Sequence, residues 1–307
     1  MKKFLAVAAL LAVSAAQAEE LRFGDLNYFL KQGQLNAGVD LLAHTEVARV
    51  DGDDTEIQAY FFNSHFGYAL SDKLNLTLGL DYIYDGQTEI EGASSADTAG
   101  LQNPKLGANF RVLNQSDFGY NFDVGAVATL KIADREVPTV TKDGNSLNPL
   151  ISSYADPRNT MDLSARLGKK WNEANEFYLT GNLAYHMDGE YETAGGDDTD
   201  MDSSMDFKLG GFYQYRPVVE FMLTVGLTGT RVGEVDTETA GNEGTITDHI
   251  DYQFNFNAKY LITDTFIAKF VFTQDNRSDF DSETDLGDTE VEKRTAKQFG
   301  LGVDFLF

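Results

Sequence analysis

The chain has 307 residues, contains no cysteine and carries a formal net charge of −25. A chain without cysteine has no disulfide scaffold, no thiol chemistry and no cysteine-ligated zinc site. The excess of acidic residues excludes nucleic acid as an expected partner, because phosphate binding requires a basic surface. Beyond the N-terminus there is no linker and no run of about eighteen apolar residues, so the sequence predicts one domain without helical membrane spans.

Residues 1–18 have the organisation of a secretory signal peptide. Two lysines follow Met1, Phe4–Val13 is a short apolar stretch, and Ala16–Ala18 is a small-x-small cleavage site. The apolar stretch is too short to cross a bilayer, so a membrane anchor is the weaker alternative. We therefore expect export through a cleaved signal peptide and a mature chain that begins at Glu19.

The segment 19–33, which contains Tyr28-Phe29-Leu30, does not follow a clear strand pattern. Three arrangements are open for it: a periplasmic leader, the beginning of the first strand, or a plug that turns into the interior. We assign 19–33 as a periplasmic N-terminal segment and 34–307 as the main domain.

From residue 35 onwards, apolar and polar residues alternate in successive segments, which is typical of β-strands with one apolar face. In the clearest segment, every even-numbered position from 74 to 84 holds leucine or tyrosine. The residues between them include Asn75, Thr77, Gly79 and Asp81. The pattern predicts about twelve strands, at residues 35–50, 57–70, 74–84, 104–112, 118–132, 161–170, 177–186, 205–214, 221–228, 250–260 and 266–272, with a last strand that ends at Phe307.

Short and long connections alternate between the predicted strands. In bacterial outer-membrane barrels the short turns face the periplasm and the long loops face the exterior, and the number of strands is even. The sequence therefore predicts an all-β fold, a transmembrane antiparallel up-and-down β-barrel of about twelve strands with both termini in the periplasm. The alternative is a soluble β-sandwich or lipocalin-like barrel, in which the apolar faces would point inward.

The last strand has apolar residues at every second position and ends on an aromatic ring. These residues are Phe299, Leu301, Val303, Phe305 and Phe307. This ending resembles the C-terminal targeting strand of bacterial outer-membrane proteins. The resemblance implies recognition by the barrel-assembly machinery and a final location in the bacterial outer membrane, in contact with lipid and lipopolysaccharide.

Charged residues of both signs fall on the faces of the strands that we expect to point inward. A barrel of twelve strands encloses a narrow or partly blocked pore, and these side chains either sort solutes by size and charge or pair with one another as part of the wall. The candidate pore-lining residues are Asp40, Asp81, Lys105, Arg111, Asp123, Lys131, Asp162, Arg166, Lys208, Asp251, Lys259 and Asp304. We expect no cofactor.

One acidic loop is a weak candidate for calcium. Asp197, Asp198, Asp200 and Asp202 offer clustered hard oxygen ligands. The stretch lacks the ligand spacing and the distal glutamate of an EF-hand loop, so solvated, mutually repelling loops are the preferred interpretation and no metal site is expected.

Pro104 has no N–H to give to a β-ladder, so it marks either the beginning of a strand or a local opening in the wall. The segment Gly100–Val112 around it resembles a glycine-, leucine- and proline-containing segment of the MetA-pathway phenol-degradation family of outer-membrane channels. Gln102, Asn103, Asn109 and Phe110 depart from the family's pattern. The resemblance implies passage of aromatic or other apolar compounds.

The sequence thus predicts a porin-like outer-membrane channel for passive diffusion or uptake of small solutes, with apolar or aromatic compounds among the candidates. A structural or adhesive barrel without transport is the alternative. A membrane-embedded hydrolase is less favoured, because the chain holds no nucleophile elbow, zinc-protease motif or phosphate loop, and its four histidines all fall at predicted inward or loop positions.

Overall fold

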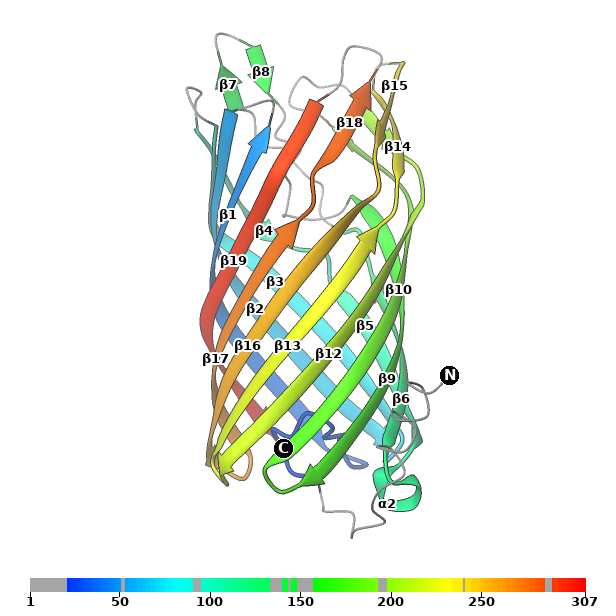
Figure 1. Cartoon of the computed structure of the whole chain (residues 1–307), viewed down its shortest axis with the longest axis vertical. Helices are drawn as coiled ribbons and strands as arrows, with labels where there is room; N and C mark the ends of the chain where they lie inside the picture. The colour runs from blue at the N-terminus through cyan, green and yellow to red at the C-terminus, as the bar shows by residue number, and fades with distance from the viewer. Residues whose placement is uncertain are drawn as a thin grey trace, which may run out of the picture.

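The computed structural model describes residues 21–50, 53–90, 95–132, 140–142, 145–147, 157–192, 198–239, 241–284 and 289–307. These residues form a closed antiparallel barrel whose wall has twelve strands around its circumference. Figure 1 shows the strands running obliquely around the barrel. The predicted signal peptide, 1–18, lies outside the described residues.

The wall strands follow the chain order, and five of them are each interrupted into two segments. The uninterrupted strands are β1 (Leu35–Val50), β2 (Asp53–Ser71), β3 (Leu74–Ile90), β6 (Asn121–Thr129), β9 (Arg158–Asn172), β10 (Asn175–Glu192) and β19 (Thr289–Leu306). The interrupted strands are β4 (Ser95–Leu101) with β5 (Lys105–Leu113), β11 (Asp198–Met201) with β12 (Ser204–Val218), β13 (Phe221–Val232) with β14 (Val235–Thr239), β15 (Asn242–Ile246) with β16 (His249–Thr263), and β17 (Phe266–Arg277) with β18 (Phe280–Thr284). A separate hairpin consists of β7 (Val140–Lys142) and β8 (Asn145–Leu147).

The barrel closes between its first and last strands. β1 pairs with β19 in antiparallel register, with Ala37 opposite Phe305. The backbone N–H of Leu35 donates to the carbonyl of Phe307 at 3.0 Å, and the N–H of Phe307 donates to the carbonyl of Leu35 at 2.7 Å. Closure removes the unpaired edges that would otherwise be unsatisfied in lipid.

The connections divide the barrel into two ends. At the turn end, short links join β2 to β3, β9 to β10, β12 to β13 and β16 to β17. The link from β5 to β6 contains the helical turn α2 (Gln115–Phe118), so Phe118 does not begin a strand as its apolar character had predicted. The C-terminus lies at this end, whereas β7, β8, β15 and β18 lie at the opposite, loop end (Figure 1). No helix in the described part of the chain is long and apolar enough to cross a membrane.

The outer surface of the barrel is apolar. Leu227 and Leu301 are 67% and 68% exposed, and they belong to a large set of exposed leucine, valine, phenylalanine and tyrosine side chains on the wall strands. Aromatic rings stack in pairs on this surface, including Trp171 with Phe177 and Phe266 with Phe305. The apolar faces therefore point away from the lumen, as expected for a barrel in lipid and opposite to the arrangement in a lipocalin-like barrel.

The described part of the N-terminal segment, residues 21–34, lies inside the barrel at the turn end (Figure 1). We call it the plug. Gly24 has φ +95°, and a β-carbon there would lie 2.8 Å from Cδ1 of Ile267, so both the backbone conformation and the close approach require glycine. At its C-terminal side, the N–H of Gly33 donates to the carbonyl of Ala69 at 2.9 Å, which leads the chain into the wall. Of the three arrangements open from the sequence, the structure has the inward plug.

Candidate functional site

A buried carboxylate holds the plug in the barrel. Asp25 accepts a hydrogen bond from Nζ of Lys170 at 3.0 Å and another from the guanidinium of Arg216. The carboxylate is fully buried, and the two basic side chains are 5% and 6% exposed. Lys170 lies near the end of β9 and Arg216 near the end of β12, so one plug residue connects two wall strands. A buried charge without partners is costly, so this cluster fixes the depth of the plug.

Asn27 makes the second connection between the plug and the wall. Its Nδ2 donates to Oε2 of Glu176 at 3.2 Å and to the carbonyl of Phe177 at 3.1 Å. The backbone carbonyl of Asn27 accepts a hydrogen bond from Nη2 of Arg111 at 2.9 Å. Arg111 also donates to both carboxylate oxygens of Asp123, at 2.7 and 3.1 Å. The plug therefore shares its polar partners with the charged interior of the wall.

A cavity of about 440 Å³ lies above the plug, and we call it the turn-side chamber. Tyr28 and Phe29 of the plug line it together with residues of the wall. The wall residues that line it are Asn75, Asn109, Asp123, Val124, Ser164, Arg166, Tyr178, Thr180, Asn182, Lys208, Phe212 and Thr228. The lining consists mainly of amide, hydroxyl and aromatic side chains, and the plug contributes two of the aromatic rings.

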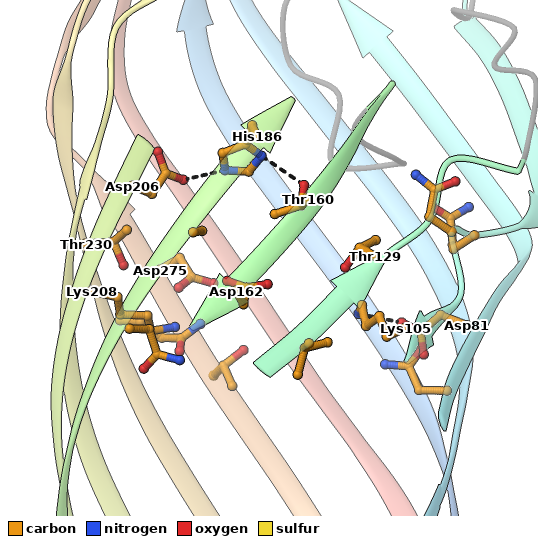
Figure 2. Close-up of a pocket in the computed structure, with 18 of the residues that line it drawn as sticks. Asp81, Lys105, Thr129, Thr160, Asp162, His186, Asp206, Lys208, Thr230 and Asp275 are labelled. Carbon is orange, nitrogen blue, oxygen red and sulfur yellow. Dashed lines mark hydrogen bonds and ion pairs between the residues drawn. The ribbon is translucent and has the colours of Figure 1, made fainter. Parts of the chain in front are cut away.

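A larger cavity of about 770 Å³, the loop-side chamber, lies further along the barrel. Four carboxylates line it, from Asp81, Asp162, Asp206 and Asp275, as do Lys105 and Lys208. Lys105 donates to Asp81 at 2.9 Å. Figure 2 shows these side chains arranged around the lumen on several wall strands. Asn182 and Lys208 line both chambers, so the two cavities adjoin.

A hydrogen-bonded chain of three side chains crosses three wall strands beside the loop-side chamber (Figure 2). Nδ1 of His186 lies 3.1 Å from Oγ1 of Thr160, and Nε2 lies 3.1 Å from Oδ2 of Asp206. In serine hydrolases Nδ1 faces the carboxylate and Nε2 faces the hydroxyl, so the order here is reversed. This geometry is that of a cross-link between β9, β10 and β12.

Two arginine–carboxylate pairs border a smaller recess of about 260 Å³ that adjoins the loop-side chamber at His44 and Asp275. Arg294 donates to both oxygens of Glu46, at 2.5 and 2.8 Å. Arg277 donates to both oxygens of Asp251, at 2.8 and 2.9 Å. Bidentate pairs of this kind fix the orientation of both side chains and leave little free charge for a solute.

Next to the seam between β1 and β19, Lys269 joins two of the predicted lumen acids. Its Nζ lies 3.0 Å from Asp40 and 2.8 Å from Asp304, and Nε2 of His65 is 3.2 Å from Asp304. A β-carbon on Gly302 would lie 2.7 Å from Cε of Lys269, so glycine makes room for the lysine. Lys269 falls within the predicted strand 266–272, but the sequence pattern gave no sign of its central position in this cluster.

The structure distributes eleven of the twelve predicted pore-lining residues over five environments. Asp81, Lys105, Asp162 and Lys208 line the loop-side chamber, Asp123 and Arg166 line the turn-side chamber, and Asp251 borders the recess. Asp40 and Asp304 belong to the seam cluster. Arg111 and Lys259 contact the plug, the latter through an Nζ–O distance of 3.4 Å to Gly24.

Two further predictions concern residues near the loops. Lys131 lies beyond the end of β6, and its Nζ donates to the carbonyl of Glu190 at 2.5 Å. Asp198 and Asp200 lie on β11, whereas Asp197 is outside the described residues. Among the described residues, no group of histidine, aspartate and glutamate side chains is arranged to hold a metal ion.

Two solved structures have the same kind of barrel. The chain is similar to an outer-membrane channel from Pseudomonas putida F1, with 15% identity and a TM-score of 0.56 over 94% of this chain and 100% of that one. It is also similar to the translocator domain of the autotransporter NalP from Neisseria meningitidis, with 11% identity and a TM-score of 0.52 over 99% of this chain and 93% of that one. No protein-family model matches the chain, and no curated protein matches it by sequence. At these identities the similarity establishes a shared fold.

Proposed function

We propose that this protein is an outer-membrane channel that lets small solutes pass through the barrel lumen. The observation that carries the proposal is the pair of adjoining chambers, of about 770 and 440 Å³, inside a closed wall. Their size is in the range of small-molecule sites. Most of the side chains that line the chambers are polar. Polar side chains around a cavity favour a lumen that holds water and solutes over a dry, packed interior. The structural similarity to an outer-membrane channel agrees with this function.

In this proposal the plug is the element that limits passage. Asp25 and Asn27 hold it across the turn end, and Tyr28 and Phe29 form the floor of the turn-side chamber. Solute enters the chambers from the loop end, and movement through the turn end requires the plug to shift. We assign the turn end, with both termini, to the periplasm, and the loop end to the exterior.

The remaining parts of the proposal follow from the exposed surface and the two ends of the chain. The apolar band contacts outer-membrane lipid, and the loop end contacts lipopolysaccharide. Export uses the cleaved signal peptide 1–18, and the barrel-assembly machinery recognises the last strand through Phe299, Leu301, Val303, Phe305 and Phe307, whose side chains lie on one outward face. We assign no enzymatic activity and no cofactor to the protein.

A second route, sideways through the wall into the membrane, would suit apolar or aromatic solutes. The observation that favours this route is the interruption of the wall at residues 102–104, between β4 and β5. Gln102 and Asn103 at this interruption also line the loop-side chamber. A solute in that chamber therefore lies next to a part of the wall with an incomplete ladder, where it could leave sideways into the membrane.

Single-channel conductance of the refolded mature protein in a planar bilayer tests the proposal. We expect discrete conductance steps whose reversal potential depends on an imposed salt gradient. A bilayer that stays silent, with circular dichroism confirming a folded barrel and no uptake of small solutes into liposomes, would instead favour a structural or adhesive role.

A further inference from the structure

A continuous row of polar side chains lines one half of the turn-side chamber. In the register of the sheet, Asn75 is opposite Asn109, which is opposite Gly125. The row continues through Ser164 and Asn182 and ends at Lys208. Five of these six positions hold an amide, a hydroxyl or an amine, and all five line the chamber. Gly125 keeps the row open, because a β-carbon there would lie 2.8 Å from Oγ of Ser164.

Two buried side-chain oxygens of residues that line this chamber have no hydrogen-bond partner among the described residues. They are Oδ1 of Asn75 and Oγ1 of Thr228. The two residues are 8% and 5% exposed, so they are more than nine-tenths buried. β3 and β13 lie on opposite sides of the barrel in the strand order, so the two residues lie on opposite walls of the chamber. Buried polar groups are normally hydrogen-bonded, so this pair indicates a ligand with donor groups at both ends of its ring or chain.

The charge of the chamber is positive. Asp123 is its one carboxylate in the described lining, and both Arg111 and Arg166 donate to it. Two guanidinium groups on one carboxylate leave an excess of positive charge. Lys208 adds a second positive charge to the lining, and it lies at the boundary with the loop-side chamber, which Asp162 and Asp275 also line. An anionic group therefore has a favourable place beside Lys208 and Arg166.

We propose that the turn-side chamber binds a small hydroxylated carboxylic acid of the sugar-acid type. The carboxylate lies beside Lys208 and Arg166, and hydroxyl groups donate to Asn75 and Thr228 and exchange hydrogen bonds with the row of amides between them. This inference rests on the proposed channel function, because it names the class of solute that the channel retains on its way to the plug.

The experiment compares three ligands that share one ring. D-glucuronate, D-glucose and D-glucosamine are titrated into the refolded mature protein in detergent micelles, with binding measured by calorimetry. We expect D-glucuronate to bind at least about tenfold more tightly than D-glucose, and D-glucosamine to bind more weakly than D-glucose. Equal binding of the three ligands, or a preference for D-glucosamine, would overturn the proposal.

Two kinds of variant separate the charge from the hydroxyl contacts. Lys208→Met should reduce D-glucuronate affinity to the level of D-glucose and leave D-glucose unchanged. Asn75→Leu with Thr228→Val should weaken both ligands by a similar factor. Lys73→Met, at an exposed turn, is the matched control and should change neither. Unchanged D-glucuronate affinity in a folded Lys208→Met variant would reject the role of Lys208 and with it the proposal.

Conductance recorded on the same preparation tests the channel function separately from the proposed binding site. Selective D-glucuronate binding in a protein that never conducts would leave the binding site in place and reject the channel. Conductance without any preference for D-glucuronate would reject the binding site and leave the channel in place.

Discussion

Asn27 of the plug lies against Gly168 of the wall, so closely that a β-carbon at position 168 would be 2.7 Å from Cγ of Asn27. Only a glycine gives the plug this approach to β9. The same contact brings two backbone positions, one on the plug and one on the wall, within the distance that a disulfide spans. The chain has no native cysteine, so an introduced pair has no competing thiol.

The double variant Asn27→Cys with Gly168→Cys should lock the plug when oxidised. We expect the oxidised protein to conduct less than the reduced protein in the same bilayer, because the plug can no longer leave the turn end. Each single-cysteine variant serves as a control and should respond to neither oxidant nor reductant. Equal conductance of the oxidised and reduced double variant would show that solutes do not pass the plug.

Replacement of Asp25 by asparagine should loosen the plug. Lys170 and Arg216 would lose their shared carboxylate, and removal of one partner from a buried ion pair costs about 3–5 kcal/mol. We expect a higher open probability and faster maleimide labelling of a cysteine introduced at position 27. Asp264→Asn is the matched control, because Asp264 is exposed in the turn between β16 and β17 and its replacement should change stability by less than about 0.5 kcal/mol.

The loop-side chamber should favour cations, because four carboxylates face two lysines in its lining. In a salt gradient, the reversal potential of the wild-type protein should therefore indicate cation preference at low ionic strength and weaker preference at high salt. Asp162→Asn with Asp275→Asn should shift the reversal potential towards the anion side. Asp117→Asn in α2, at the turn end, should leave it unchanged; an equal shift there would mean that surface charge sets the selectivity.

Pro104→Val tests the route through the wall. The N–H of Gln102 already donates to the carbonyl of Asp81 at 2.8 Å and that of Leu130 to the carbonyl of Pro104 at 3.0 Å, so a valine N–H adds to a partly formed ladder. If apolar solutes leave sideways here, their uptake into liposomes should fall while ion conductance stays constant. Unchanged uptake of every apolar solute would contradict this route.

The alternation of apolar and polar residues along the sequence was sufficient to predict the strands of the barrel wall. β1 extends from Leu35 to Val50, as the pattern predicted, and exposed apolar residues such as Leu41 and Val47 alternate along it with inward polar residues such as Glu46. The same signal fails where a segment leaves the sheet. Phe118 and Lys131 continue the alternation beyond the two ends of β6, and one lies in a helical turn while the other reaches across to Glu190.

The plug and the grouping of charges could not be predicted in this way. A period of two indicates which side of the wall a residue faces, but it does not indicate height along the barrel, so the shared contact of Lys269 with Asp40 and Asp304 depends on register. In the plug, the side chains of Asp25 and Asn27 bind wall side chains more than a hundred positions away, namely Lys170, Arg216 and Glu176. The local signals in the sequence were Asp25 and Asn27, which lie among the mostly apolar residues of 23–30.

The opposite charges of the two adjoining chambers have a consequence for the direction of current. Fixed negative charge lies on the loop side and fixed positive charge on the turn side, and the boundary between them is at Asn182 and Lys208. One polarity of voltage drives mobile ions of both signs towards this boundary, and the other polarity depletes it. In symmetric salt the barrel should therefore behave as a diode, with unequal current at equal voltages of opposite sign.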